Sequence, residues 1–352
     1  MSGQEPSLPR HAFIIGGTGQ IGLAITQNPL TAGWTVSVGS RGQRNHHSHL
    51  ADRRVNYVAV DRERPGELAC ALGNGTDALI DVTAYDAVHG RQLLDVQGSV
   101  GALVVVSSSS VYRDNAGRTL DEAAQNGFPE LPDPITEAQP TVETGDVTYS
   151  TRKVALERTL FDEATVPVTI LRPAAIYGAD SIHPREWWFV KRMLDGRQVI
   201  PLAHEGRSRF HTSSVLNIAE LARFALDKPA TRILNIADPA ALSVAEIGSA
   251  VAAHMGYEGE FIKLSSDIFP AGIGRTPWSV PRPFVLDNRA ALALGYVPMT
   301  SYARAVHIVC DEPVKTQDDD WRSRFPILAS YPYDLFDYRA EDDAIVRARQ
   351  AI

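Results

Sequence analysis

Cysteine is nearly absent from this chain, and its scarcity removes several classes of protein. Only Cys70 and Cys310 occur among the 352 residues, too few for a disulfide framework or a cysteine metal cluster. No apolar run approaches the roughly 20 residues of a membrane span. The polar start, Met1 to Arg10, also lacks the apolar core of a signal peptide. We therefore expect a cytoplasmic protein with no membrane partner.

Excess positive charge is missing as well. The formal net charge is −8, which argues against a polyanion such as nucleic acid as the main partner. The composition, 44% hydrophobic and 22% charged, is ordinary for a globular protein, and the length suits one large or two closely packed domains. These bounds favour a small-molecule substrate and leave a homodimer open.

Lysine is almost absent from the first half, and its one occurrence is informative. Lys153 is the only lysine in the first 190 residues, which hold 14 arginines. It follows Tyr149 by four positions, so on a helix the two side chains share a face. An ammonium beside a phenol favours the phenolate and would lower its pKa, which suits a general acid/base at a carbinol oxygen. The alternative is an ordinary surface helix.

Short apolar runs alternate with helical patterns through the first half. This alternation predicts an α/β fold with a doubly wound parallel sheet. A helix is expected over 21–30 and a long surface loop over 114–147. Strands are expected over 12–15, 35–38, 55–60, 78–82, 102–106, 166–171 and 233–236.

A glycine-rich turn joins the first expected strand to the first helix. Such a turn lets the backbone approach a pyrophosphate, which the helix N-terminus stabilises. A plain tight turn is the alternative, but the place between strand and helix favours a dinucleotide. The residues are Gly16, Gly17, Thr18, Gly19, Gln20, Ile21 and Gly22.

The end of the second strand indicates which dinucleotide is bound. An NAD site usually has an acidic residue about 20 positions after the glycines, but Gly39-Ser40-Arg41-Gly42 stands there. Arg41 could clamp a 2′-phosphate with help from Ser40, so NADP(H) is favoured over NAD(H). Asp61, after the third strand, is placed to accept from the adenine amino group. A solvated Arg41 and an ordinary strand-end Asp61 are the alternatives.

A serine run, Ser107-Ser108-Ser109-Ser110-Val111-Tyr112, follows the fifth strand at the edge where such sheets place ligands. Together with the glycine turn, Tyr149-x-x-x-Lys153 and Leu171-Arg172-Pro173, it resembles the extended short-chain dehydrogenase/reductase superfamily, in a divergent bacterial branch. The resemblance covers about residues 11–310.

The resemblance implies roles for further residues. Ser108 takes the place of the catalytic serine, and Lys153 also holds the nicotinamide ribose. Cofactor contacts are implied for Val82, Thr83, Ala84 and Arg172, and substrate contacts for Tyr85 and Ser109. The dinucleotide domain would be 11–177 plus about 212–237, the substrate lobe about 178–211 plus 238–310, and 311–352 an extension of unknown role. Ser109-Ser110 replaces the acidic pair of the family's dehydratases, which argues against dehydration.

The expected substrate lobe contains side chains suited to ligands. Arg185 could bind a phosphate or carboxylate beside a stacking Trp187, and Arg209 and His211 are phosphate-binding candidates. For each, the alternative is packing or a plain surface position. No metal-ligand spacing is present.

Three hypotheses follow. The first is an NAD(P)-dependent oxidoreductase that uses Tyr149, Lys153 and Ser108 to interconvert a ketone and a secondary alcohol on a sugar-nucleotide-like or other small polar metabolite. The second is a nucleotide-sugar epimerase with a tightly bound cofactor. The third is a dinucleotide-sensing or RNA-binding regulator with vestigial catalytic residues.

Overall fold

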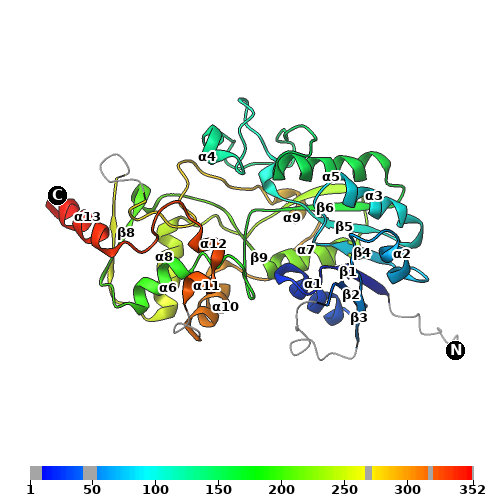
Figure 1. The fold of residues 1–352 in the computed structure, drawn as a ribbon, viewed down its shortest axis with the longest axis horizontal. Helices are drawn as coiled ribbons and strands as arrows, with labels where there is room; N and C mark the ends of the chain where they lie inside the picture. The colour runs from blue at the N-terminus through cyan, green and yellow to red at the C-terminus, as the bar shows by residue number, and fades with distance from the viewer. Residues whose placement is uncertain (1–9, 43–53, 266–271, 316–319, 351–352) are drawn as a thin grey trace.

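A parallel sheet forms the centre of the first half of the molecule. The structure is a computed structural model that describes residues 10–42, 54–265, 272–315 and 320–350. Seven parallel strands lie in the order β10-β6-β5-β4-β1-β2-β3 (Figure 1). They are β1 (His11–Ile15), β2 (Thr35–Ser40), β3 (Val55–Ala59), β4 (Ala78–Asp81), β5 (Leu103–Val106), β6 (Val168–Pro173) and β10 (Arg232–Ile236). The predicted doubly wound α/β fold is confirmed.

Helices cover both faces of this sheet, as Figure 1 shows. One face packs on α1 (Gln20–Thr31) and α7 (Val215–Asp227), and the other on α2 (Glu67–Leu72), α3 (Ala87–Asp95) and α5 (Tyr149–Glu163). Both layers bury branched apolar side chains, such as Ile25 against the first face and Leu156 against the second. Strands β4 and β5 are therefore buried along their whole length, as their apolar sequences predict.

The strand order reverses beside β1, and this position determines where a ligand can bind. Strand β1 pairs with β2 on one side and with β4 on the other. The chain therefore leaves the carboxyl ends of β1 and β4 in opposite directions, which opens a crevice at that edge of the sheet. The glycine turn, the segment after β3 and the loop after β4 all meet there.

The stretch 114–147 is not simply a surface loop, so that prediction needs correction. It contains the short helix α4 (Ala123–Asn126), and Ile135 forms a β-bridge with Leu286. Ile135 is fully buried in an apolar cluster with Tyr112 and Phe284. An apolar residue inside an acidic, proline-rich segment anchors that segment to the core.

A second lobe follows the sheet and has its own core. Its strands form two pairs, β7 (Ala175–Tyr177) with β9 (Thr212–Ser214) and β8 (Val199–Leu202) with β11 (Glu260–Lys263). Its helices are α6 (Trp187–Leu194), α8 (Val244–Met255) and α10 (Tyr302–Lys315); α9 (Arg289–Ala293) packs near β10. Ser243 and Glu246 form a capping box at the start of α8. The described residues also contain three short 3-10 helices, Gln97–Ser99, Ser109–Val111 and Ala203–Gly206.

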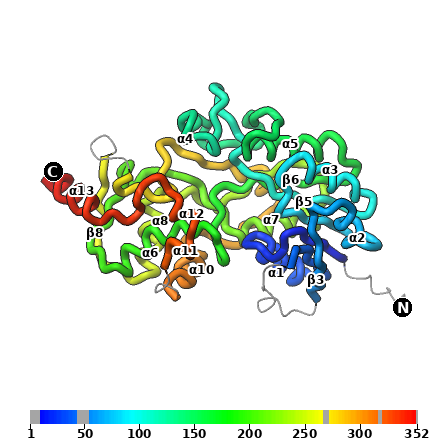
Figure 2. Tube along the Cα trace, in the orientation of Figure 1, coloured from blue at the N-terminus to red at the C-terminus, as the bar shows by residue number. Residues whose placement is uncertain are grey.

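The C-terminal segment belongs to this second core. It forms α11 (Trp321–Arg324), α12 (Pro326–Ala329) and α13 (Tyr338–Gln350). Trp321, Phe325 and Leu328 are buried in the same cluster as Trp187 of α6. The tube in Figure 2 shows this last, red part of the chain lying along the second lobe. The C-terminal segment, to which the sequence assigned no role, therefore contributes side chains to the core of the second lobe.

Within the described residues, no helix is both long and apolar enough to cross a membrane. The cytoplasmic location stays a prediction.

Candidate functional site

The glycine turn has the geometry of a phosphate cradle. Gly16 has φ +80°, a conformation that side chains disfavour, and a Cβ on Gly22 would overlap the carbonyl oxygen of Gly16. Gly22 thus lets α1 pack directly against the turn. A Cβ on Gly19 would meet only the Gly16 oxygen, at 3.6 Å, so open space lies beside it. Because Gly19 caps α1 without a side chain, the first N–H groups of the helix suit a pyrophosphate.

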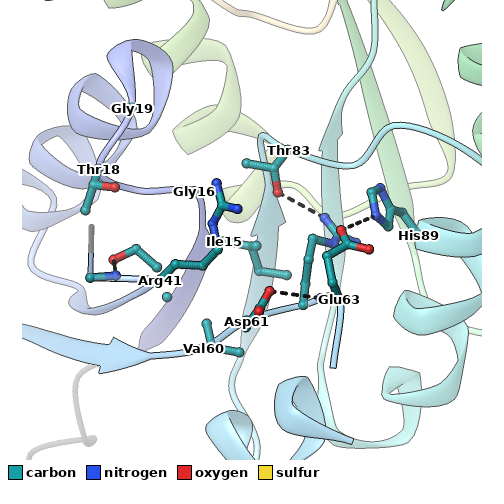
Figure 3. Close-up of a pocket in the computed structure, with 14 residues that line it drawn as sticks. Ile15, Gly16, Thr18, Gly19, Arg41, Val60, Asp61, Glu63, Thr83 and His89 are labelled. Carbon is teal, nitrogen blue, oxygen red and sulfur yellow. Dashed lines mark hydrogen bonds and ion pairs between the residues drawn. The ribbon is translucent and has the colours of Figure 1, made fainter. Parts of the chain in front are cut away.

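A cavity of about 350 Å³ opens beside this turn. Figure 3 shows its wall, formed by the turn, the end of β2, the segment after β3 and the loop after β4. Of the predicted cofactor residues, those on the cavity are Gly16, Thr18, Gly19, Ser40, Arg41, Asp61 and Thr83.

The other residues of the turn lie outside the cavity wall. A Cβ on Gly17 would press on Val38, which shows that this glycine packs against β2. The amide of Gln20 donates to the carbonyl of Gly178, 3.3 Å away, at the start of the second lobe. Ile21 packs against the core beneath the sheet. These residues hold the turn in place and do not line the cavity.

The sequence did not predict three polar side chains of the cavity wall. Arg62, Glu63 and His89 also line the wall. Arg62 and Glu63 directly follow the strand-end residue Asp61, so the rule that strand ends converge could have found them. His89 lies one turn into α3, and no sequence pattern singled it out.

Tyr149 and Lys153 lie together at the start of α5. Thr148 and Thr151 form a reciprocal capping box that begins this helix at Tyr149. The Lys153 Nζ is 5.7 Å from the centre of the Tyr149 ring. It donates to two backbone carbonyls, of Ala84 at 2.6 Å and of Val106 at 3.2 Å. The predicted helical pairing of the two side chains is therefore present.

The pKa of Tyr149 changes in the direction opposite to the prediction. Burial raises the pKa of Tyr149, and the hydrogen bond from Ser108 only partly opposes this. Burial also lowers the pKa of Lys153 to about 8. The prediction that the ammonium lowers the phenol pKa is thus wrong for the protein alone. The Lys153 amine is directed at carbonyls, and desolvation outweighs its attraction for a phenolate.

The serine run and a second tyrosine surround the phenol. Ser108 lies close enough to Tyr149 to lower its pKa, and the Oγ of Ser108 lies 3.0 Å from the Oγ of Ser110. The ring of Tyr85 lies 5.5 Å from that of Tyr149. Ser109 is buried beside them, with 3% of its surface exposed. Ser108 is therefore the serine of the run that influences the Tyr149 phenol, and its catalytic role stays a prediction.

The loop after β4 brings the predicted Val82, Thr83 and Ala84 to the site. Ala84 is fully buried, and its carbonyl holds Lys153. A Cβ on Gly16 would strike Thr83 and press on Val82, so this loop packs directly on the glycine turn. The cradle and the Tyr149–Lys153 pair thus share one supporting loop.

Arg172 requires a correction. Its side chain is 3% exposed and forms an ion pair with Glu157 of α5, with 3.0 Å between Nε and Oε1. Its guanidinium also stacks on the ring of Tyr112 at 4.9 Å. Arg172 therefore links β6 to α5 inside the protein, away from the cavity wall where a cofactor contact was predicted.

Two of the predicted substrate residues, Trp187 and His211, are buried in the interior of the second lobe. Trp187 is 3% exposed and packs against Phe325. His211 donates from Nε2 to the carbonyl of Asp238 at 2.9 Å, while its Nδ1 accepts from the N–H of Leu286. Burial lowers the pKa of His211 to about 4, so the ring is neutral. Neither side chain presents a ligand-binding face.

The two predicted arginines of this lobe differ. Arg185 donates from Nη1 to the carbonyl of Ile176 at 3.0 Å, and burial lowers its pKa. Arg209 is 37% exposed at its side chain, forms an ion pair with Asp133 and lines a cavity of about 450 Å³. Among the described residues, no group of three or more possible metal ligands occurs.

The chain was compared with known proteins. Residues 12–237 match the NAD dependent epimerase/dehydratase family. A curated relative, 2′-dehydrokanamycin reductase from Streptomyces kanamyceticus, is 28% identical over 174 residues, which is 48% of this chain and 44% of the relative. The match thus spans less than half the length of that relative.

Solved structures share the fold at low identity. UDP-N-acetylglucosamine 4-epimerase from Bacillus cereus superposes with a TM-score of 0.62 at 18% identity, covering 86% of this chain and 99% of that one. The enzyme WbmH from Bordetella bronchiseptica, solved with NAD+, gives 0.64 at 18%, covering 87% and 99%. A dTDP-glucose 4,6-dehydratase from Bacillus anthracis, solved with NAD, gives 0.65 at 15%, covering 88% and 98%. The family model covers well over half of the chain, and the chain therefore belongs to the NAD dependent epimerase/dehydratase family.

Proposed function

We propose that this enzyme is an oxidoreductase that interconverts a ketone and a secondary alcohol on a small polar metabolite. The observation that carries the proposal is that Tyr149 and Lys153 share one face of α5 and that Lys153 is bonded to the loop after β4, which also packs on the glycine turn. The curated relative named as a reductase supports it. A nicotinamide dinucleotide, which the glycine turn and the residues after β2 would hold, would supply or accept the hydride.

The chain's own residues handle the proton and the oxygen. In the reducing direction, Tyr149 donates its phenolic proton to the developing alkoxide, and Ser108 hydrogen-bonds the same oxygen. Burial raises the Tyr149 pKa, so the phenol is protonated before the reaction, although it is a weaker acid than a free phenol. Lys153 is held by two carbonyls, so its charge stays close to the phenolate that donation leaves behind.

The cofactor proposed is NADP(H), with NAD(H) as the alternative. Arg41 and Ser40 lie on the cavity wall directly after β2, where a ribose 2′-phosphate would be recognised. The acidic residues of this wall, Asp61 and Glu63, come instead from the segment after β3. The end of β2 therefore offers a guanidinium and a hydroxyl to the ribose.

The arginines that line the cavity of the second lobe do not favour binding of a diphosphate group there. Three arginines line the cavity of about 450 Å³, and each is already paired with a carboxylate. Arg209 pairs with Asp133, while Arg207–Glu205 and Arg282–Glu130 lie 2.9 and 2.8 Å apart. Paired arginines attract a phosphate less than free ones, because the carboxylate repels the same anion.

An epimerase is the second candidate, because a structural neighbour is a UDP-N-acetylglucosamine 4-epimerase. The two functions separate in one experiment. The purified protein is incubated with NADPH or NADH and a panel of polyhydroxylated ketones, amino-sugar ketones and nucleotide sugars, and absorbance and products are followed. Stoichiometric NADPH oxidation is expected. Epimer formation without net oxidation, by a protein that retains dinucleotide through purification, would favour the epimerase and contradict the proposal.

A further inference from the structure

The short segment after β3 connects the dinucleotide cavity to the catalytic pair. Asp61, Arg62 and Glu63 all line the cavity wall. From Arg62 and Glu63, two separate chains of hydrogen bonds lead into the loop between β4 and α3. Each chain ends on a residue that contacts Tyr149 or Lys153.

The first chain runs through a buried ion pair. The Nη1 of Arg62 lies 2.6 Å from Oδ2 of Asp81, and the side chains are only 9% and 1% exposed. Gln92 holds the guanidinium from the other side, accepting from Nε at 3.3 Å and from Nη2 at 3.2 Å. Burial and multiple bonds make this pair far more rigid than a surface ion pair.

The carboxylate of Asp81 fixes the backbone that holds Lys153. Its Oδ1 accepts from the N–H groups of Thr83 and Ala84, both at 2.8 Å. Those two bonds orient the peptide units on either side of Thr83 and so set the direction of the Ala84 residue. The Ala84 carbonyl then accepts from Lys153 Nζ at 2.6 Å. The ammonium position therefore depends on Asp81 and, through it, on Arg62.

The second chain leads to Tyr149. Glu63 lies 3.1 Å from Nε2 of His89, a contact visible in Figure 3. The Nδ1 of His89 accepts from the N–H of Tyr85 at 2.9 Å, so the ring proton is on Nε2 and is donated to Glu63. The Tyr85 ring, fixed at its backbone in this way, lies against the ring of Tyr149.

We propose that Arg62–Asp81 and Glu63–His89 are positioning pairs, which hold the β4–α3 loop so that Ala84 and Tyr85 place Lys153 and Tyr149. The proposal rests on the proposed function of Tyr149 and Lys153. It extends that function to four residues that contact neither the Tyr149 hydroxyl nor the Lys153 amine. A purely structural role would affect stability alone, whereas positioning affects turnover and the environment of the Lys153 amine.

Asp81→Asn is the sharpest test, because it keeps the size of the side chain but sets an amide N–H against the Arg62 guanidinium. We expect turnover to fall about 10- to 100-fold, as for loss of a charge-assisted hydrogen bond, while the Kd for NADPH changes less than about threefold. Asp77→Asn is the matched control. Asp77 immediately precedes the same strand and accepts from the N–H of His11 at 2.7 Å, at the end away from the site. This control should leave turnover unchanged.

A second readout needs neither cofactor nor substrate. Lys153 is one of five lysines in the chain, so its acetylation by acetic anhydride can be followed by peptide mass spectrometry. In Asp81→Asn we expect Lys153 to react about tenfold faster, because a freed amine is more accessible. The other four lysines should react as in the wild type. This readout still applies if the proposed function is wrong, and Tyr149→Phe activity tests that function separately.

Arg62→Lys and Arg62→Met separate charge from packing, since the lysine variant should keep more turnover than the methionine variant.

If Asp81→Asn does not fold, Gln92→Leu, which removes the second hydrogen-bond partner of the Arg62 guanidinium, must lower turnover and speed Lys153 acetylation. A folded Asp81→Asn or Gln92→Leu protein with wild-type turnover and acetylation overturns the proposal. So does a variant whose only defect is weaker NADPH binding, because Arg62 would then act by touching the cofactor.

Discussion

Two buried arginine–carboxylate pairs, one in each half of the molecule, differ in how fully they are satisfied. The Arg62–Asp81 pair of the sheet domain has hydrogen-bond partners around both groups. Arg192 and Glu341 pair α6 with α13 in the second lobe, at 1% and 4% exposure. Among the described residues, Nε of Arg192 and Oε2 of Glu341 have no hydrogen-bond partner. The Arg62–Asp81 pair fixes the backbone of the loop after β4. The Arg192–Glu341 pair joins α13 to α6, and its two unbonded polar atoms carry a desolvation cost.

The comparison extends to whole regions. Several charged side chains of the sheet domain line the crevice, while charged side chains of the second lobe pack under aromatic rings. Arg192, for example, lies 3.5 Å above the Trp188 ring. Substitutions of residues that line the crevice or act on the reacting groups should therefore change catalysis more than stability, and substitutions in the second core should do the opposite.

The largest effect is expected at Tyr149. Tyr149→Phe keeps the ring and its contact with Tyr85 but removes the acid/base oxygen. Turnover should fall roughly 10²- to 10⁴-fold, while the Kd for NADPH and the unfolding temperature stay close to wild type. Steady-state kinetics, calorimetric titration and thermal unfolding measure the three quantities. A variant with wild-type turnover would refute the role given to Tyr149.

Lys153→Arg sharpens the same point by preserving charge. A guanidinium is larger and planar, and the space between the Ala84 and Val106 carbonyls fits a compact ammonium. We expect a loss of turnover together with weaker binding of the dinucleotide, since the lysine is also expected to hold the ribose. A fully active variant would show that this pocket does not require lysine.

Glu341→Gln tests the second region. It leaves the Arg192 guanidinium buried beside a neutral amide, and an unpaired buried charge typically costs about 3–5 kcal/mol of unfolding free energy. Denaturant unfolding measures this loss, and NADPH titration of the folded variant should give the wild-type Kd. Weaker cofactor binding at constant stability would mean that the two regions are not separable as described.

Arg41→Ala should act on one cofactor only. Loss of a charged contact to a 2′-phosphate costs on the order of 1.5–3 kcal/mol, which weakens NADP(H) but hardly changes NAD(H). Parallel titrations with both dinucleotides supply the comparison. Equal affinities in the wild type would remove the argument for NADP(H).

The smallest effect is expected at Arg209, whose pairing with Asp133 is partly exposed. Arg209→Ala should change the unfolding free energy by less than about 1 kcal/mol and the KM by less than about threefold, because the carboxylate already occupies the guanidinium. Substrate kinetics decide the point. A tenfold rise in KM would make Arg209 a substrate residue after all.

The sequence predicts the sheet domain well because its signals are local. Continuous apolar strands such as β5 and a glycine turn at a strand–helix junction follow from backbone chemistry alone. The second lobe is harder to predict, since burial decides whether Trp187 or His211 faces a ligand or the core. Their burial depends on segments distant in the sequence, such as Phe325 beside Trp187 and Leu286 beside His211. The same limit hides the Arg62–Asp81 pair and reverses the expected pKa change at Tyr149, where desolvation dominates.

The contribution of Trp321, Phe325 and Leu328 to the second core has a consequence for biosynthesis. The central sheet has all its strands once residue 236 has left the ribosome, so the first half can fold early. The second core lacks these side chains for roughly a further 90 residues of synthesis, and Trp187 remains uncovered on that side. During this interval the nascent chain presents an aromatic surface to chaperones and proteases, so premature termination before residue 321 should yield a protein that is degraded even though its dinucleotide-binding half is fully formed.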